Sequence, residues 1–207
     1  MIAKLVWNET RNDGKYIICF VGSFIVKIIH VLFSNFLLLW VTSFVDEGFF
    51  TEDESKDFYE YLMLVGTIVA AILLPFFGML GDRLSSTIMV PLAFSFRALC
   101  GFSFMFLTDP QSTATFCVVS ALTCATMLEA ISIDVLLYRG MPGGIRGTMM
   151  GAYTCFGLTG IASFTLVGGQ LFDRLGSTAP IYGLATLDSF MVLLSIIMAC
   201  LGFFKGN

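Results

Sequence analysis

Six long apolar stretches constrain this sequence more than any other feature. A helix needs about 20 mostly apolar residues to cross the hydrocarbon core of a bilayer. Six segments meet that requirement: Tyr16–Phe44, Tyr59–Leu80, Thr87–Leu107, Ser112–Tyr138, Thr148–Phe172 and Pro180–Phe204. They are too long, and alternate too little, to be the strands of a membrane barrel. The sequence therefore predicts an all-α membrane protein with six transmembrane helices.

Composition excludes several other classes of protein. Hydrophobic residues make up 57% of the chain and charged residues 13%, whereas soluble domains average about 45–50% and about 25%. The net charge of −4 gives no basic surface for nucleic acid. The six cysteines lie within apolar stretches without a C-x-x-C spacing, which indicates small buried side chains rather than a zinc or redox site.

The gaps between the apolar stretches are too short to hold a second domain. We expect a polar N-terminal segment over residues 1–15, one transmembrane domain over 16–204 and a short tail over 205–207. The first apolar stretch is much longer than the core of a secretory signal, so it is expected to remain in the membrane.

Lysine and arginine residues predict the orientation. An inner amino terminus places seven basic residues inside: Lys4, Arg11, Lys15, Arg83, Arg139, Arg146 and Lys205. Only Lys56 and Arg174 then lie outside. The positive-inside rule therefore predicts that both termini face the cytoplasm or its topological equivalent, with the acidic loop Asp46–Asp57 on the other side. The plasma membrane and an organelle membrane, such as the mitochondrial inner membrane, both stay open.

One short pattern, G-x-x-x-D-R-L, occurs twice. It covers Gly78–Leu84 after the second predicted span and Gly169–Leu175 after the fifth. Three spans separate the two copies, so they lie on opposite membrane faces. Such an arrangement is typical of the inverted three-plus-three repeats of transporters.

The first copy resembles the loop motif G-x-L-x-D-R-x-G-R-K of the major facilitator superfamily. Gly78 to Arg83 fit the motif, whereas Ser85, Ser86 and Thr87 replace its glycine and two basic residues. The segments Pro142–Gly151 and Gly168–Gly176 are similar to the two ends of the fifth helix in that family's carboxyl-terminal half. The resemblance implies half of a major-facilitator-type fold, because family members have twelve helices and this chain has six.

That resemblance implies membrane transport of a small solute by alternating access. The missing half would come from another membrane chain or from a second copy. The alternative is a non-transporting subunit of a larger membrane complex built on a transporter-like scaffold. The resemblance also implies a conformational latch at the inner face; its residues are Gly78, Gly81, Asp82, Arg83 and Arg146. The other interpretation of Asp82 and Arg83 is that they are solvated turn residues.

Ionisable side chains inside predicted spans each need a reason, because inserting one costs about 2.5–3.5 kcal/mol. Five lie well inside, namely Lys27, His30, Arg97, Glu129 and Asp188, and Asp134 lies nearer the inner end of its span. In the first span, helical spacing gathers four polar residues on one face: Ser23, Lys27, His30 and Ser34. Lipid cannot solvate that face, so it should turn toward protein or water.

Lys27, Arg97 and Glu129 lie at similar depths, so either basic residue is a possible partner of Glu129. The resemblance favours Lys27, because it places the first and fourth helices of a half along the substrate cavity. Arg97 is then interpreted as structural.

Four residues are candidates for binding the substrate or a proton: Lys27, His30, Glu129 and Asp134. The alternative for Lys27 and Glu129 is a buried ion pair that fixes helix register. His30 is either a proton relay or a hydrogen-bonded packing residue.

Small residues in the fifth span predict close helix packing. They are Gly147, Gly151, Cys155, Gly157 and Gly160. No catalytic motif occurs, and the single histidine excludes a multi-histidine metal or haem site, so we expect neither enzymatic activity nor a cofactor.

Overall fold

The computed structural model describes residues 14–139, 141 and 143–202 of the 207-residue chain. Most of the predicted N-terminal segment, the basic residues Lys4, Arg11 and Lys205, Pro142 and the tail over 205–207 lie outside the described residues.

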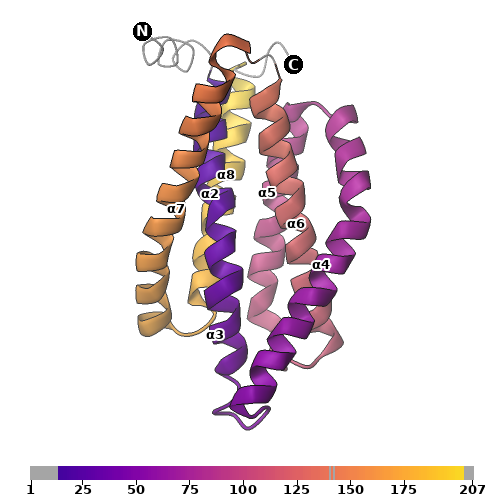
Figure 1. The fold of residues 1–207 in the computed structure, drawn as a ribbon, viewed down its shortest axis with the longest axis vertical. Coiled ribbons are helices and arrows are strands. Elements are labelled where there is room, and N and C mark those ends of the chain that lie inside the picture. The colour runs from indigo at the N-terminus through magenta and orange to yellow at the C-terminus, as the bar shows by residue number, and fades with distance from the viewer. Residues whose placement is uncertain (1–13, 140, 142, 203–207) are drawn as a thin grey trace.

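Helices account for nearly all of the described chain (Figure 1). The first span consists of α2 (Lys15–Val31), a π-helical turn η1 (Leu32–Phe36) and α3 (Leu37–Thr42). The others are α4 (Glu52–Arg83), α5 (Ser86–Ser103) with the 3₁₀ turn η2 (Phe104–Phe106), α6 (Thr113–Tyr138), the 3₁₀ turn η3 (Gly143–Ile145) with α7 (Arg146–Leu175), and α8 (Ala179–Cys200). Six helices are long and apolar enough to cross a membrane, which confirms the prediction of a multi-pass, all-α membrane protein.

The second span is longer than predicted. It begins at Glu52 rather than Tyr59, so half of the expected acidic loop is helix. A capping box starts it: the Thr51 hydroxyl accepts from the Glu54 amide, and the Glu54 carboxylate accepts from the Thr51 amide at 2.8 Å. Acidic side chains in the first turn also interact favourably with the helix dipole.

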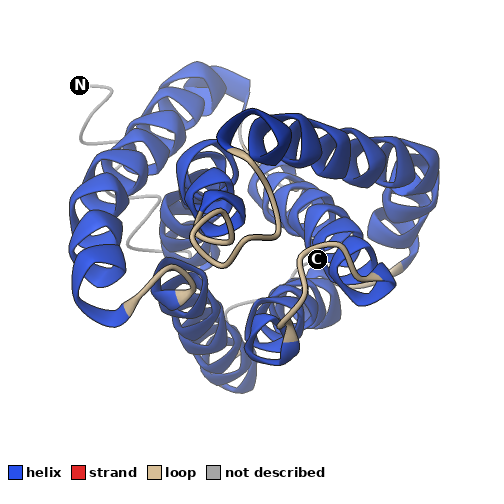
Figure 2. Cartoon of the chain, turned by 90° about the horizontal axis from the view of Figure 1, so that it is seen from below, coloured by secondary structure: helices blue, strands red, loops and turns tan. Residues whose placement is uncertain are grey.

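The six spans form a bundle in which three helix pairs have the most extensive contacts. These pairs are α2 with α7, α4 with α6, and α5 with α8, and α6 also packs along α5. Figure 2 shows the bundle from below. The first and last described residues lie at the same end, as an even number of spans requires (Figure 1).

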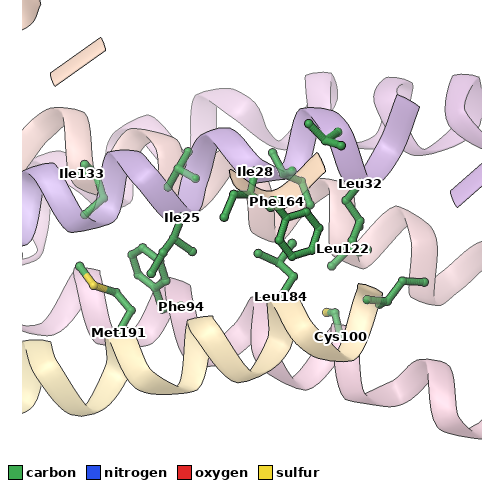
Figure 3. Close-up of a cluster of buried hydrophobic side chains, with 14 of the residues drawn as sticks. Ile25, Ile28, Leu32, Phe94, Cys100, Leu122, Ile133, Phe164, Leu184 and Met191 are labelled. Atoms are coloured by element: carbon green, nitrogen blue, oxygen red, sulfur yellow. The ribbon is translucent and has the colours of Figure 1, made fainter. Parts of the chain in front are cut away.

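The centre of the bundle is a continuous apolar core (Figure 3). Ile25 and Ile28 of α2 meet Phe94 of α5 and the α8 side chains Leu184 and Met191, and all five are buried. By contrast, most side chains of α4 and α7 lie at the surface of the bundle, and few of them are buried. Those two helices therefore offer the widest apolar surfaces to lipid or to another membrane chain.

Close packing of α2 on α7 depends on two of the predicted glycines. A Cβ at Gly157 would lie 2.5 Å from Lys27 Cγ, and one at Gly160 would collide with the backbone carbonyl of Phe24. The prediction was wrong for Gly147 and Gly151, where a Cβ would meet nothing within 4 Å, and for Cys155, which is exposed. The face of α7 that packs on α2 therefore contains Tyr153, Gly157 and Gly160, whereas Gly147 and Gly151 lie on another face.

Candidate functional site

The charged residues inside the bundle form two separate groups on opposite sides of α6. Glu129 and Asp134 are five residues apart, and at about 100° per residue they point about 140° apart around the helix axis. Glu129 turns toward α5 and α8, whereas Asp134 turns toward α2 and α7. The two carboxylates therefore belong to different environments.

The first group, here called the Arg97 cluster, consists of Arg97 of α5, Glu129 of α6 and Asp188 of α8. Arg97 donates from Nε to Asp188 Oδ2 at 2.9 Å and from Nη2 to Asp188 Oδ1, which makes a bidentate pair. Its Nη1 forms an ion pair with Glu129 Oε2. All three side chains are almost completely buried, with at most 1% of each exposed. The cluster joins three helices within the bundle interior.

This geometry corrects the favoured pairing of Glu129. Its partner is Arg97, not Lys27, although all three residues lie at the similar depths that the sequence predicted. Depth follows from the rise per residue, but the pairing depends on how far each helix is rotated about its axis. Arg97 is buried in the bundle interior with Asp188 as its main partner, and its structural role stays a prediction.

The second group, here called the Lys27 face, is formed by α2, α6 and α7. The half-buried Asp134 accepts a hydrogen bond from the Tyr153 hydroxyl at 3.0 Å, and the Tyr153 carbonyl accepts one from Ser23 Oγ at 2.7 Å. The aliphatic part of Lys27 lies over Gly157, beside Ser23 on the surface of α2 that packs on α7. Lys27 makes no ion pair within 4 Å among the described residues, so its ammonium remains available to another group.

His30 and Ser34 continue the Lys27 face toward the other end of α2. Both are exposed, and Ser34 Oγ donates to the His30 carbonyl at 2.7 Å. Ser34 lies within the π-helical turn η1, and the Tyr59 hydroxyl of α4 donates to the carbonyl of Phe33 in the same turn at 2.7 Å. Such turns occur often at functional sites. The predicted polar stripe therefore divides into a buried end at Ser23 and an open end at His30 and Ser34.

Arg139, which is not among the predicted latch residues, contacts the turn between α4 and α5. Arg139, at the end of α6, donates to the Gly81 carbonyl at 2.9 Å and to Ser86 Oγ at 3.2 Å, so it bridges the end of α4 and the start of α5. Arg146 instead lies over the Tyr138 ring, 5.2 Å from its centroid.

The remaining latch residues fall into two sets. Gly81 is buried near Met89, whereas a Cβ at Gly78 would meet nothing within 4 Å. Asp82 and Arg83 are exposed. Exposure fits the solvated-turn interpretation of this pair, and the latch role stays a prediction.

Sequence reasoning missed Tyr153 and Arg139. Tyr153 is an aromatic residue in an apolar span, so nothing in the sequence distinguished its hydroxyl from that of a packing residue. Arg139 entered the sequence analysis only as a basic residue on the inner side of the membrane. An arginine directly after a helix is nevertheless a common donor to exposed carbonyls. No group of three or more metal-ligating side chains occurs among the described residues.

Comparisons with known proteins found no relative of this chain. No family model matches it, and neither the curated proteins nor the solved structures give a significant match. The likeness to the major facilitator superfamily therefore rests on the sequence motifs alone, and function has to be argued from the two charged groups.

Proposed function

We propose that this chain is one half of a transporter that moves a small solute by alternating access. A second half, supplied by another membrane chain or by a second copy, would complete the path. The single observation that carries the proposal is the Lys27 face: an ammonium without an ion-pair partner among the described residues, next to an exposed imidazole, in the apolar part of a spanning helix. Intramembrane ionisable groups of this kind typically face water-filled paths or partner chains.

The packing of the helices supports an inverted repeat of the kind the motifs suggested. Exchanging the first three spans with the last three turns the α2–α7 pair into the α6–α4 pair and leaves the α5–α8 pair unchanged. These three contacts are consistent with a two-fold axis in the membrane plane, whereas the extensive α5–α6 contact has only a small counterpart between α8 and α2. Transporters of this construction move their repeats or bundles about a site near the midplane.

Water access to the Lys27 face is the first test. In a chain whose exposed cysteines Cys117, Cys155 and Cys200 are replaced by serine, His30→Cys should react with a membrane-impermeant thiol reagent. The matched control is Ile72→Cys on α4, which is 65% exposed but lies on an apolar surface, and it should not react. Equal reactivity at the two positions would argue against a solute path along α2.

Uptake is the second test. Cells producing the chain should deplete one or more members of a defined mixture of small solutes, measured by mass spectrometry. Lys27→Ala should abolish that depletion while the protein remains inserted. If solute depletion in the presence of the partner is the same with and without the chain, the transport proposal is contradicted.

The wide apolar surfaces of α4 and α7 favour a second candidate, a non-transporting subunit that packs against other membrane chains. In that case, Lys27→Ala should weaken co-purification of the partner chain and lower abundance, with no solute depletion by the wild-type protein.

A further inference from the structure

The Arg97 cluster contains an imbalance of charge. One guanidinium faces two carboxyl groups, Glu129 and Asp188, so full ionisation would leave one uncompensated negative charge. The three side chains are at most 1% exposed, so water cannot solvate that charge. Isolated buried charges are so unfavourable that the group usually becomes neutral instead.

Among the residues that the structure describes, no other charged group is placed to balance the cluster. Arg97 is the only ionised side chain on α5, and Asp188 is the only one on α8. On α2, Lys27 lies over Gly157 of α7, on the side of α6 that Asp134 faces, and Lys15 lies in the first turn of the helix. The charged residues of α4 and α7 are confined to the ends of those helices. A metal ion is also a poor candidate, because the cluster offers two carboxyl groups and a repelling guanidinium, and the described residues contain no group of three metal ligands.

The two carboxyl groups are held differently. Asp188 uses both oxygens in the bidentate pair with Arg97, the arrangement that best stabilises a carboxylate. Glu129 approaches Arg97 through Oε2 alone, and neither of its oxygens makes a hydrogen bond among the described residues. Protonation of Glu129 therefore sacrifices fewer interactions with Arg97 than protonation of Asp188 would.

We propose that the Arg97 cluster is a proton-binding site in which Glu129 takes one proton from water as the chain folds and retains it at neutral pH. The bound proton leaves one cation and one anion, Arg97 and Asp188, in the bundle interior. Because the charge count is the same in a transporter and in a structural subunit, the inference does not depend on the proposed function.

The direct test uses the wild-type chain reconstituted in phosphatidylcholine vesicles, with ¹³C-labelled glutamate carboxyl groups observed by solid-state NMR. The other described glutamates are all exposed: Glu47, Glu52, Glu54 and Glu60. At pH 7, we expect one carboxyl signal at the position of a protonated acid, and Glu129→Gln should remove it. A spectrum of ionised glutamates only, or a protonated signal that persists in Glu129→Gln, would overturn the proposal.

Labelled aspartate provides the complementary measurement. A protonated aspartate at pH 7 that Asp188→Asn removes would place the proton on Asp188 and contradict the assignment to Glu129. Because both spectra come from the wild-type chain, the choice between a protonated glutamate and a protonated aspartate stands even if a variant fails to fold.

Stability of two isosteric variants is the second readout. Glu129→Gln replaces one neutral group with another of similar shape, so its unfolding midpoint at pH 7 should equal that of the wild type. Asp188→Asn removes an anion that Arg97 needs, so its midpoint should be clearly lower. Equal losses in the two variants would show that Glu129 is required as an anion.

Discussion

The Arg97 cluster and the Lys27 face place similar side chains in different surroundings. In the cluster, all three side chains are buried, and Arg97 directs Nε, Nη1 and Nη2 at the carboxyl groups of Asp188 and Glu129. On the Lys27 face, the cation has no ion-pair partner among the described residues and the neighbouring imidazole is exposed. The difference suggests that the first group holds helices together and the second serves a ligand or a partner.

The largest expected effect on stability is in the Arg97 cluster. Asp188→Ala should destabilise the folded chain by about 3–5 kcal/mol, because it leaves a buried arginine without its bidentate partner. Unfolding in mixed detergent micelles would measure the difference. Asp134→Ala is the control in the Lys27 face, and it should lower the free energy of unfolding by clearly less. Similar losses at both positions would remove the distinction between the groups.

A smaller loss is expected where the Lys27 face depends on close helix packing. Gly160→Ala should destabilise by about 1–3 kcal/mol, because the added methyl group collides with the Phe24 carbonyl. Gly151→Ala on the same helix meets nothing within 4 Å and should not destabilise the chain, because alanine has the higher helix propensity. The same unfolding assay applies, and a neutral Gly160→Ala would show that α2 and α7 are farther apart than described.

Outside both groups, the start of α4 should show a capping effect. Thr51→Ala should cost about 1 kcal/mol, because it removes the acceptor of the Glu54 amide. Ser85→Ala is a matched control, since Ser85 precedes α5 without a side-chain capping bond. Hydrogen exchange of the amides in the first turn of α4 would report the loss locally, and equal exchange in both variants would contradict it.

The smallest effect on stability is expected at the open end of the Lys27 face. His30→Ala should change the free energy of unfolding by no more than about 0.5 kcal/mol, because the side chain is exposed. Any effect on solute uptake or partner binding should therefore appear without loss of folded protein. A large destabilisation would indicate that the imidazole is packed rather than open.

The six spans could be predicted from the sequence because length and hydrophobicity decide membrane insertion directly. The early start of α4 could also have been predicted, because Thr51 and Glu54 have capping-box spacing. Their acidic neighbours instead suggested a loop. The partner of Glu129 could not be decided. Lys27 and Arg97 lie at similar depths, and only the rotation of each helix, set by packing throughout the bundle, determines which one it meets.

The bidentate pair between Arg97 and Asp188 has a consequence for biosynthesis. The two residues are 91 positions apart, and ribosomes add about 5–20 residues per second. Arg97 therefore leaves the ribosome roughly 5–18 s before Asp188. Glu129, made 32 residues after Arg97, is the first acidic partner available to it. During this interval, the nascent chain has to keep the arginine near headgroups, water or the insertion machinery, and only arrival of the last helix allows it to settle in the interior.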